Sequence, residues 1–535
     1  MSDILSYFPT PPLDGPRGGQ EAVMKEVESA IAAGYKMILI EAPVGFGKSA
    51  VAMAIARWSG SAHVLTPQKS LQDQYFEDFS MYSILMKGRS SYPCVFFETP
   101  DDAQAVRNRV TRGELMSVPR GDRHCGQGPC KDSPENYKRC TNFDGEKEHT
   151  PCPYSLAIDT ASEKPIIIHN LHSYIYQTHF GNNFSPRKVM IIDEGHRIEG
   201  ILRDFAKFSV SLPGMLGSDE ERDKWTNFED IGDWMSYFTE PRFVPEKEDD
   251  QKKYMERLGK LESLTNDFPN MWNRFAVSAE ELGGLGVTRF ELTPEKLGGL
   301  PQKLLYSGGD VTIIMSGTIY DKAMFCRDRG INQESAYFIR IGSTFPLASR
   351  PIIMKQDYMV DTSHKMWAEN LPEIVTKLKK ILEVFKDVKG LVHVPSYRAA
   401  FDLMQAMREP RLVTHAPEDS ASRLQEFYAS AGNQVYVSPT CQEGVDFKND
   451  RARFQVILRI PYMNAGDEFI AMKLKTDFAW YNYQALITFG QQTGRINRSE
   501  KDFGVTILMD SRFPKFIGKN KSRLPKWFRD SIKES

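Results

Sequence analysis

A glycine-rich loop near the start of this 535-residue chain lies between a short apolar run and a helix-forming stretch. The apolar run covers residues 37–40 and the helix-forming stretch covers residues 50–58. The loop between them consists of Ala42, Pro43, Val44, Gly45, Phe46, Gly47, Lys48 and Ser49. A phosphate-binding loop requires this context of strand, loop and helix. Its glycines let backbone N–H groups turn toward a phosphate without a Cβ clash, and the helix N-terminus adds positive charge.

We therefore expect the loop to bind a nucleoside triphosphate. Lys48 would reach the β- and γ-phosphates, and Ser49 would be a ligand of Mg²⁺. The first position is Ala42 where glycine is usual, which is a small departure from the pattern. The other interpretation is a glycine-rich turn that ends in Lys-Ser by chance.

Short apolar runs alternate with helix-like stretches along the whole chain, which is typical of parallel α/β units. A first set of runs covers residues 37–40, 64–65, 166–168, 189–192 and 311–315, and a second set covers residues 391–394, 435–437, 454–458 and 505–508. Residues 343–346 break the pattern. A chain of this length is too long for one hydrophobic core. The sequence therefore predicts two separate sheets, with a boundary near residue 345.

The composition is that of an ordinary globular protein, with 41% hydrophobic and 26% charged residues. There is no apolar run of about 18 residues to span a membrane, and no basic and apolar secretion signal at the N-terminus. We therefore expect a cytoplasmic protein. The formal net charge of -2 argues mildly against a protein that coats nucleic acid by bulk charge. It does not argue against a motor that holds one strand in a local groove.

Two acidic residues, Asp193 and Glu194, follow the apolar run at residues 189–192. The carboxyl end of a strand is where an open α/β sheet binds its ligands. We expect Asp193 to hold Mg²⁺, through water, and Glu194 to orient and deprotonate the water that attacks the γ-phosphate. An acidic pair in this position can also be a plain helix cap. The phosphate-binding loop favours the catalytic interpretation.

Residues 491–498 contain Gln491 and two arginines, Arg495 and Arg498, that are three positions apart. On a helix both arginines would point to one face. Forked guanidinium groups suit the charge of a γ-phosphate during its transfer, although two such arginines can also form surface salt bridges. Because these residues belong to the second set of strands, the sequence predicts ATP in a cleft between two domains.

The order and spacing of these motifs resemble the superfamily 2 helicases, in particular the XPD/DinG branch of iron–sulfur DNA helicases, over nearly the whole chain. Arg17 and Gln20 resemble the family's adenine-reading element, and Gly444 and Asp446 belong to a segment similar to its motif V. Further segments match other motifs of the family: residues 63–74, 168–172, 316–318, 394–397 and 501–504. Gly195 and Gly317 stand where alanine is usual in the family.

The resemblance implies an ATP-dependent DNA helicase that binds ATP and Mg²⁺, moves 5′ to 3′ on single-stranded DNA and unwinds duplex DNA. The catalytic set would be Lys48, Asp193, Glu194, Gln491, Arg495 and Arg498. The expected partners are single-stranded and forked DNA, bound by a monomer. The alternative is a DEAH-type RNA helicase or a nucleic-acid remodelling ATPase, which would use the same motor on another substrate.

The resemblance also implies an α/β fold with two RecA-like parallel-sheet motor domains, the first of which carries two inserts. The first motor domain would comprise residues 1–87, 161–204 and 301–344, and the second would comprise residues 345–535. Residues 88–160 would form an iron–sulfur cluster domain. Residues 205–300 would form a small helical, arch-like insert.

Five of the seven cysteines lie within residues 88–160, which in a reducing compartment suggests a metal rather than disulfides. Thiolates suit either an iron–sulfur cluster or zinc. The resemblance implies a [4Fe–4S] cluster, with Cys94 and Cys152 as the first and last ligands. Between these two, Cys130 and Cys140 are favoured and Cys125 is left as a spare, although choices that include Cys125 stay open.

Contacts to a DNA strand are expected from Thr66, Gln74, Ser396, Tyr397 and Arg398, each of which can also be an ordinary loop residue. A translocating motor grips the phosphate backbone and reads little sequence. The chain ends in a basic run that includes Lys515 and Lys526 beside Phe516 and Trp527. We interpret this run as a solubilising tail.

Overall fold

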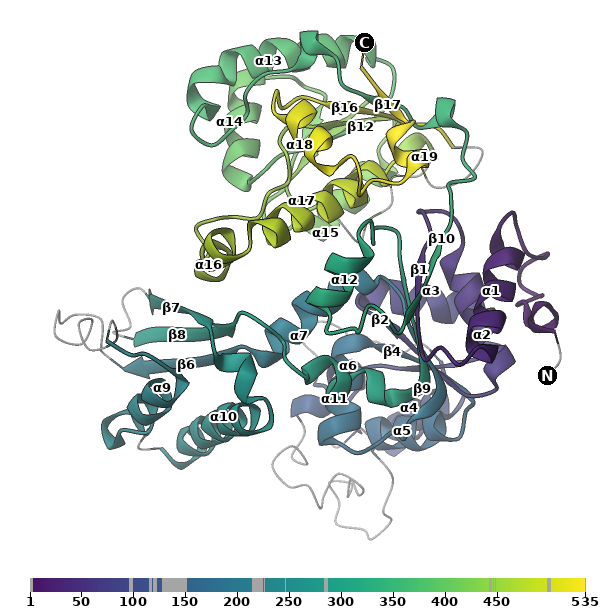
Figure 1. The fold of residues 1–535 in the computed structure, drawn as a ribbon, viewed down its shortest axis with the longest axis vertical. Helices are drawn as coiled ribbons and strands as arrows, with labels where there is room; N and C mark the ends of the chain where they lie inside the picture. Colours follow the sequence, from purple (N-terminus) through teal and green to yellow (C-terminus); the bar gives the residue numbers. More distant parts are fainter. Residues whose placement is uncertain are drawn as a thin grey trace. The chain divides into compact units, whose positions relative to one another are not determined.

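The computed structural model describes residues 3–95, 100–114, 118, 123–127, 152–213, 225, 227–245, 247–282, 287–441, 445, 447, 449–497 and 502–534 (Figure 1). The chain forms two compact units. The first contains Met1–Arg197, Leu304–Gly317 and Glu334–Ile341, and the second contains Ile198–Lys303, Thr318–Gln333 and Gly342–Ser535. Within the described residues, no helix is both long enough and apolar enough to cross a membrane.

Seven parallel strands of the described residues form the sheet of the first unit, in the order β10-β1-β9-β5-β2-β4-β3. The strands are β1 (Met37–Glu41), β2 (Ala62–Thr66), β3 (Ile84–Met86), β4 (Ile166–Asn170), β5 (Arg187–Ile192), β9 (Gly309–Ser316) and β10 (Ala336–Arg340). Strands β2 and β4 are buried along their whole length. Burial on both faces explains why the inner strands read as continuous apolar runs.

The helices of the first unit are α1 (Gln20–Ala32), α2 (Lys48–Ser59), α3 (Lys69–Phe79), α4 (Pro100–Thr111), α5 (Pro153–Ser162) and α6 (Leu171–Ile175). The helix that follows the glycine-rich loop, α2, is buried along seven consecutive residues, 50–56. Four of these residues are alanines, whose small side chains let a helix approach its neighbours closely. The loop before α2 is therefore held by a rigid helix.

The apolar runs predicted as strands of the first sheet are confirmed, but β3 and β10 were not predicted. Both strands lie at the edges of the sheet. Strand β3 is apolar and buried, but its three residues are too few to stand out as a run. Strand β10 mixes buried, partly exposed and exposed positions. An edge strand is covered less completely than a central one, so β10 needs no continuous apolar run.

A second parallel sheet in the described part of the chain has the strand order β13-β14-β12-β15-β16-β11-β17. Its strands are β11 (Ile352–Ile353), β12 (Gly390–His393), β13 (Leu412–Val413), β14 (Val435–Ser438), β15 (Phe454–Ile457), β16 (Val505–Leu508) and β17 (Ile532–Lys533). The prediction of an α/β protein with two parallel sheets is thus confirmed, as are the four predicted runs of the second sheet.

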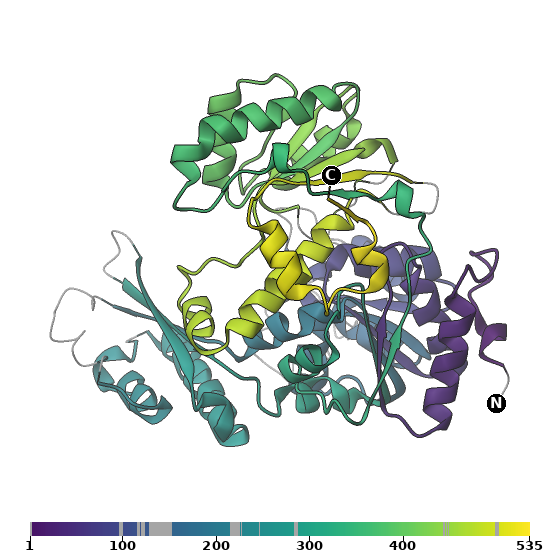
Figure 2. The ribbon, with the colours of Figure 1, turned by 45° about the horizontal axis from the view of Figure 1, so that its top comes forward.

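Helices cover both faces of the second sheet. They are α13 (Trp367–Val384), α14 (Tyr397–Met407), α15 (Ser420–Ala429), α16 (Glu468–Thr476), α17 (Phe478–Thr493), α18 (Phe513–Asn520) and α19 (Lys526–Arg529). Val392 and Val456 face the core formed with α13 and α14, whereas Ile457 faces the core formed with α17 and α18. Figure 2 shows α13 and α14, in green, over this sheet.

The predicted helical insert at residues 205–300 also contains a sheet. Its elements are α7 (Ile198–Ala206), β6 (Phe208–Pro213), α9 (Ile231–Phe238), α10 (Glu248–Asp267), β7 (Phe275–Leu282), β8 (Val287–Pro294) and α11 (Leu300–Leu304). Among the described residues, β6, β8 and β7 pair antiparallel in that order. The prediction of a helical insert is thus incomplete. Strand β8 alternates polar and apolar residues only from Arg289 to Thr293, and this short period of two was overlooked beside the clearer period of α10.

Two further segments pack in the second unit. Helix α12 (Lys322–Asp328) brings Met324 into the same core as Trp480 and Phe489 of α17. Phe516 of α18 and Phe528 of α19 are also buried in this core, and β17 pairs with β11. The interpretation of the C-terminal basic run as a solubilising tail is therefore wrong, because its aromatic residues anchor two helices in a core.

Candidate ATP site

The glycine-rich loop has the backbone of a phosphate-binding loop. Gly45 and Gly47 have φ angles of 78° and 84°, a region that residues with a Cβ rarely adopt. Gly47 is the N-cap of α2, so Lys48 is the first residue of the helix. A Cβ on Gly47 would lie 2.5 Å from Nε2 of Gln20. Both conformation and space therefore require glycine at this position.

Gln20, predicted to read the adenine, lies directly against the loop. Its Nε2 donates to the carbonyl of Phe46 at 2.8 Å and to that of Gly47 at 3.3 Å, and its Oε1 accepts from the backbone N–H of Arg17 at 2.8 Å. The side chain is buried. Gln20 thus fixes the loop by bonding two of its carbonyls, and it ties the Arg17 segment to α1.

The two predicted acidic residues meet the loop at the carboxyl end of β5. Nζ of Lys48 lies 3.8 Å from Oε1 of Glu194. Asp193 is buried, and its carboxylate accepts hydrogen bonds from the Tyr75 hydroxyl at 2.9 Å and from the Glu194 N–H at 2.8 Å. Burial, together with the charge of Glu194, raises the pKa of Asp193 above its usual value. A cation beside this carboxylate would offset both effects.

Glu194 has a φ of 49°, which is unusual for a residue with a side chain. Nδ1 of His196 lies 3.2 Å from Oε2 of Glu194 and 3.2 Å from the hydroxyl of Ser316. Backbone strain of this kind persists where the surroundings hold a functional side chain in place. His196 and Lys48 contact the two different oxygens of Glu194, and so fix its carboxylate between them.

Strand β9 brings Ser316 to the loop because it pairs with β1. The carbonyl of Ser316 accepts from the Ala42 N–H at 3.1 Å. A Cβ on Gly317 would lie 3.6 Å from the carbonyl oxygen of Ala42, so the alanine usual in the family would fit here without a clash. The ends of β1, β5 and β9 thus gather the loop, the acidic pair and Ser316 in one place.

In the second unit, Arg495 is buried and joins two predicted motifs. Its NH1 donates to the carbonyl of Val445 at 2.8 Å, and its own carbonyl accepts from the Phe447 N–H at 3.2 Å. Nε2 of Gln491 donates to the hydroxyl of Thr318 at 2.9 Å. Three other predicted site residues, Gly444, Asp446 and Arg498, lie outside the described residues.

The residues predicted to contact DNA differ in their surroundings. Thr66 is buried, whereas Gln74 and Arg398 are exposed, and Arg398 pairs with Asp402 at 2.9 Å. The hydroxyl of Ser396 accepts from the Ala399 N–H and caps α14, and the ring of Tyr397 meets His415 edge-on. Ser396 therefore has a structural role, while Gln74 and Arg398 are open to a ligand.

Three of the five clustered cysteines fall among the described residues, and all three are buried. Sγ of Cys125 lies 3.6 Å from Sγ of Cys152, and it donates to the Pro93 carbonyl, next to Cys94. The hydrogen bond with Cys152, burial and the charges of Cys152 and Cys94 raise the pKa of the Cys125 thiol. Cys125 thus lies beside a predicted ligand, although the sequence favoured Cys130 and Cys140.

Cys130 and Cys140 lie outside the described residues. Among the residues that the structure does describe, no group of three or more His, Cys, Asp or Glu side chains is arranged to hold a metal ion. A short bridge between Pro93 and His124 brings Cys125 close to the segment of Cys94. Nothing in the cysteine spacing indicates this pairing, because it depends on two loops that meet in space.

Known proteins resemble this chain in sequence and in fold. Two families match it: one described as Helicase C-terminal domain, over residues 378–531, and one described as Type III restriction enzyme, res subunit, over residues 14–208. The ATP-dependent DNA helicase YoaA of Haemophilus influenzae is 21% identical over 91% of this chain and 90% of its own length. The solved structure XPD_Helicase covers 98% of this chain and 100% of its own, with a TM-score of 0.61 at 15% identity.

In sequence and in fold the chain is similar to the XPD/DinG-like branch of the superfamily 2 helicases. Several animal and amoebal relatives match over a shorter stretch. The Fanconi anemia group J protein homolog of Gallus gallus is 31% identical over 102 residues, which are 17% of this chain and 8% of that protein. Across the first four such relatives the chain spans 8% to 16% of their length.

The site contains two residues that sequence reasoning missed. Tyr75, which bonds Asp193, lies on α3 and is fully buried. Thr318 was recognised only as part of a motif, and its partner Gln491 lies 173 residues away. Both contacts depend on which elements are neighbours in space. A local motif carries no signal for that.

Proposed function

We propose that the chain is an ATP-dependent DNA helicase that moves along single-stranded DNA, 5′ to 3′, and unwinds duplex DNA. The observation that carries this proposal is the gathering of Lys48, Glu194, His196 and Ser316 in the first unit. DNA is favoured over RNA because YoaA, the relative that matches over most of its length, is named an ATP-dependent DNA helicase.

The chemistry follows from these contacts. The backbone N–H groups of the loop and the N-terminus of α2 would hold the β- and γ-phosphates, together with Lys48. Asp193 and Ser49 would hold Mg²⁺. Glu194 would take a proton from the attacking water, because its carboxylate is fixed at one oxygen by His196 and faces Lys48 at the other. Phosphoryl transfer needs such positioning more than covalent chemistry.

Residues 316–318 support a link between hydrolysis and movement. Ser316 contacts His196 in the first unit, and Thr318 contacts Gln491 in the second. A change at the γ-phosphate that moved Glu194 and His196 would therefore also move Ser316. Thr318 lies two residues after Ser316, so the movement would pass through Thr318 to Gln491. We propose that Gln491, Arg495 and Arg498 take part in ATP hydrolysis, and that Gly444 and Asp446 contribute to nucleotide binding.

We propose that the cysteines hold a [4Fe–4S] cluster, with Cys125 in the ligand set. Buried thiols suit such a cluster, since its irons would stabilise thiolates that burial alone disfavours. Cys94, Cys125 and Cys152 would be three ligands, and Cys130 or Cys140 would be the fourth. The cluster would stiffen residues 88–160, a segment with few core residues. The two strands of the DNA duplex would separate beside this segment.

The test is strand displacement on 5′-tailed, 3′-tailed and forked duplexes, with single-stranded RNA as the competing substrate in the ATPase assay. We expect unwinding of the 5′-tailed and forked duplexes, and none by Lys48→Ala. A Lys48→Ala protein with full DNA-stimulated ATPase activity would overturn the motor assignment. Anaerobic purification should give a brown protein with about four irons per chain. Stoichiometric zinc in a colourless protein would contradict the cluster.

A further inference from the structure

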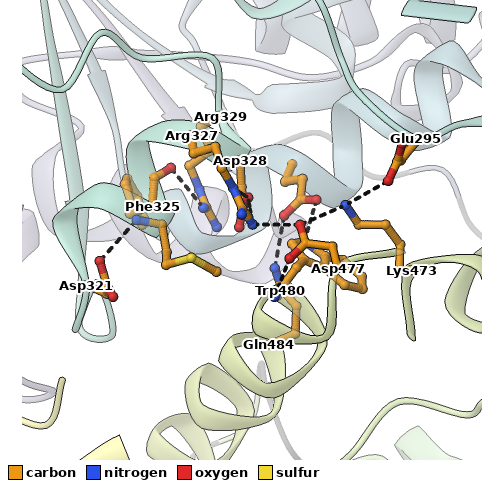
Figure 3. Close-up of polar contacts among 12 residues, drawn as sticks. Glu295, Asp321, Phe325, Arg327, Asp328, Arg329, Lys473, Asp477, Trp480 and Gln484 are labelled. Carbon is orange, nitrogen blue, oxygen red and sulfur yellow. Dashed lines mark hydrogen bonds and ion pairs between the residues drawn. The ribbon is translucent and has the colours of Figure 1, made fainter. Parts of the chain in front are cut away.

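A buried carboxylate at the start of α7 bonds two side chains of α17. One oxygen of Glu199 accepts from the Trp480 indole N–H at 2.8 Å and from NH2 of Arg203 at 2.5 Å. The other oxygen accepts from Nε2 of Gln484 at 2.9 Å. The Glu199 side chain is only 6% exposed. We call Glu199, Arg203, Trp480 and Gln484 the Glu199 network, and Figure 3 shows Trp480 and Gln484 within it.

The two ends of this network belong to segments next to the ATP motifs. Helix α7 begins at Ile198, directly after the turn Gly195–Arg197 that follows Asp193 and Glu194. Trp480 and Gln484 are four residues apart, on one face of α17, and the same helix carries Gln491 near its end. Glu199 therefore joins the helix that follows the acidic motif to the helix that precedes Arg495.

Other contacts attach the middle and the end of α17 to residues that follow Ser316. The Tyr483 hydroxyl donates to the Ile319 carbonyl at 2.6 Å, and Gln491 donates to Thr318. Along its length, α17 is thus bonded to the segments that continue from two ATP motifs of the first unit. The residues that hydrolysis would move, His196 and Ser316, each lead within three residues to a contact with α17.

Arg203 of the Glu199 network also bonds the end of β8, near the end of the insert. NH1 of Arg203 donates to the carbonyls of Pro294 at 2.6 Å and Glu295 at 3.0 Å, where β8 ends. The Glu295 carboxylate accepts from Thr476 at 2.9 Å and lies 3.9 Å from Nζ of Lys473. Figure 3 shows Lys473 between Glu295 and Asp477. The helix that leads into the insert is therefore bonded to α17, and the segment at the end of β8 is bonded to α16.

We propose that Glu199 is a positioning residue that holds α7, the insert and α17 in fixed positions relative to one another, so that Gln491 and Arg495 are aligned when ATP is hydrolysed. This rests on the proposed helicase function. Arg203 already pairs with the charge of Glu199 at 2.5 Å, so the two additional donors from α17 are a specific link between the helices. A link of this kind affects the alignment of groups in the transition state and leaves the phosphate-binding loop untouched.

The test compares Glu199→Gln and Trp480→Phe with the wild type. In E199Q an amide NH₂ group replaces one of the two carboxylate oxygens. Both oxygens accept a hydrogen bond from α17, so the NH₂ group would face a donor and one of these bonds would be lost. In W480F the Glu199–Arg203 pair stays intact and only one hydrogen bond is lost, so this variant carries the test if E199Q does not fold. The matched control is Glu291→Gln. Glu291 lies on β8, pairs with Lys207 at 3.2 Å and with Arg289 at 2.8 Å, and belongs to neither α7 nor α17.

We expect the KM for ATP to stay within twofold of wild type in both variants. The DNA-stimulated kcat should fall about tenfold in E199Q and about threefold in W480F, and the double variant should be no slower than E199Q. Base pairs unwound per ATP should fall in parallel, and E291Q should behave as wild type. Folded variants with wild-type kcat would overturn the inference, as would a KM that rises as much as kcat falls.

Failure of the proposed function gives a different result, because the wild type would then hydrolyse no ATP in the presence of DNA. Hydrogen exchange of the α17 amides tests the link independently of activity. Exchange across residues 478–487 should be at least tenfold faster in E199Q than in wild type or E291Q. Unchanged exchange would contradict a link from Glu199 to α17, whatever the protein's activity.

Discussion

At Gly47 both the backbone and its surroundings exclude a side chain. The φ of 84° disfavours a Cβ, and that atom would lie 2.5 Å from Gln20 Nε2. We expect Gly47→Ala to weaken ATP binding at least tenfold, because Gln20 must leave the loop carbonyls that it holds. The loss of stability should be about 1–2 kcal/mol. Fluorescent-nucleotide titration and thermal unfolding measure the two effects.

Gly60, at the other end of α2, provides the matched control. Its φ of 74° gives the same backbone penalty, but a Cβ there would meet nothing within 4 Å. Gly60→Ala should therefore lose a similar amount of stability and bind ATP as wild type does. Equal loss of ATP affinity in both variants would mean that helix strain, and not the Gln20 contact, controls the loop.

Glu194 separates ATP binding from ATP hydrolysis. Replacing it by glutamine keeps the shape of the side chain and removes the base, while Lys48 and the loop remain. We expect Glu194→Gln to bind ATP within about threefold of wild type and to lose about 10²–10⁴-fold in kcat. Single-turnover ATPase and nucleotide binding measured on the same preparation check both parts. A kcat within fivefold of wild type would assign the base to another residue.

Among the elements, α17 packs closely against its neighbours at Gly490. A Cβ on Gly490 would lie 1.9 Å from the hydroxyl oxygen of Tyr320, so α17 and the segment after Ser316 are in contact there without room for a methyl group. We expect Gly490→Ala to destabilise the second unit by about 2 kcal/mol or more and to lower kcat, because helix and segment must separate. Denaturant unfolding measures the first effect.

A glycine on α18 provides the comparison for Gly490. A Cβ on Gly518 would meet nothing within 4 Å. Alanine there should stabilise the helix by about 0.5–1 kcal/mol, since it restricts the unfolded chain without a clash. If Gly490→Ala were as stable as Gly518→Ala, the close approach of α17 to Tyr320 would not exist in solution.

The elements also show where sequence reasoning ends. The central strands were predictable because each is buried on both faces and reads as an apolar run. The loop, Lys48 and the acidic pair were predictable because their chemistry lies within a few adjacent residues. The Ser316–His196 contact was not, since it requires β9 to lie between β1 and β5. Nothing in either segment specifies that strand order.

At the scale of the molecule, the predicted boundary near residue 345 describes the two sheets better than it describes the compact units. Thr318–Gln333 and the insert pack with the second sheet, although they lie earlier in the chain. The chain therefore crosses between the units directly after both ATP motifs, at residues 197–198 and 317–318. A motor that converts hydrolysis into movement needs covalent connections from the residues that bind and hydrolyse ATP to the other unit. The chain provides such connections at these two points.

Buried histidines make the whole molecule sensitive to acid. Burial lowers the pKa of His63 and of His393 from 6.5 to about 4, and it also lowers the pKa of His169. Their neutral forms are favoured in the folded state, so the unfolded chain binds more protons between pH 6.5 and about 4. Their contribution to stability is complete above pH 6.5 and is lost as the pH falls. At pH 5, His63 and His393 would each cost about 2 kcal/mol.

Asp328 acts in the opposite direction, because burial raises its pKa from 3.8 to about 6 and its folded form gains protons as the pH falls. Asp193, whose pKa burial also raises, acts in the same direction as Asp328. Two carboxyls do not offset three histidines, so urea unfolding should show lower stability at pH 5 than at pH 7.5. Nε2 of His393 lies 3.0 Å from the side-chain oxygen Oε1 of Gln455. His393→Gln keeps a hydrogen-bond donor for this oxygen and removes one titrating group. Its pH dependence should be flatter by about 2 kcal/mol across this range. If wild-type stability were the same at both pH values, the three histidines would have to be protonated in the folded protein.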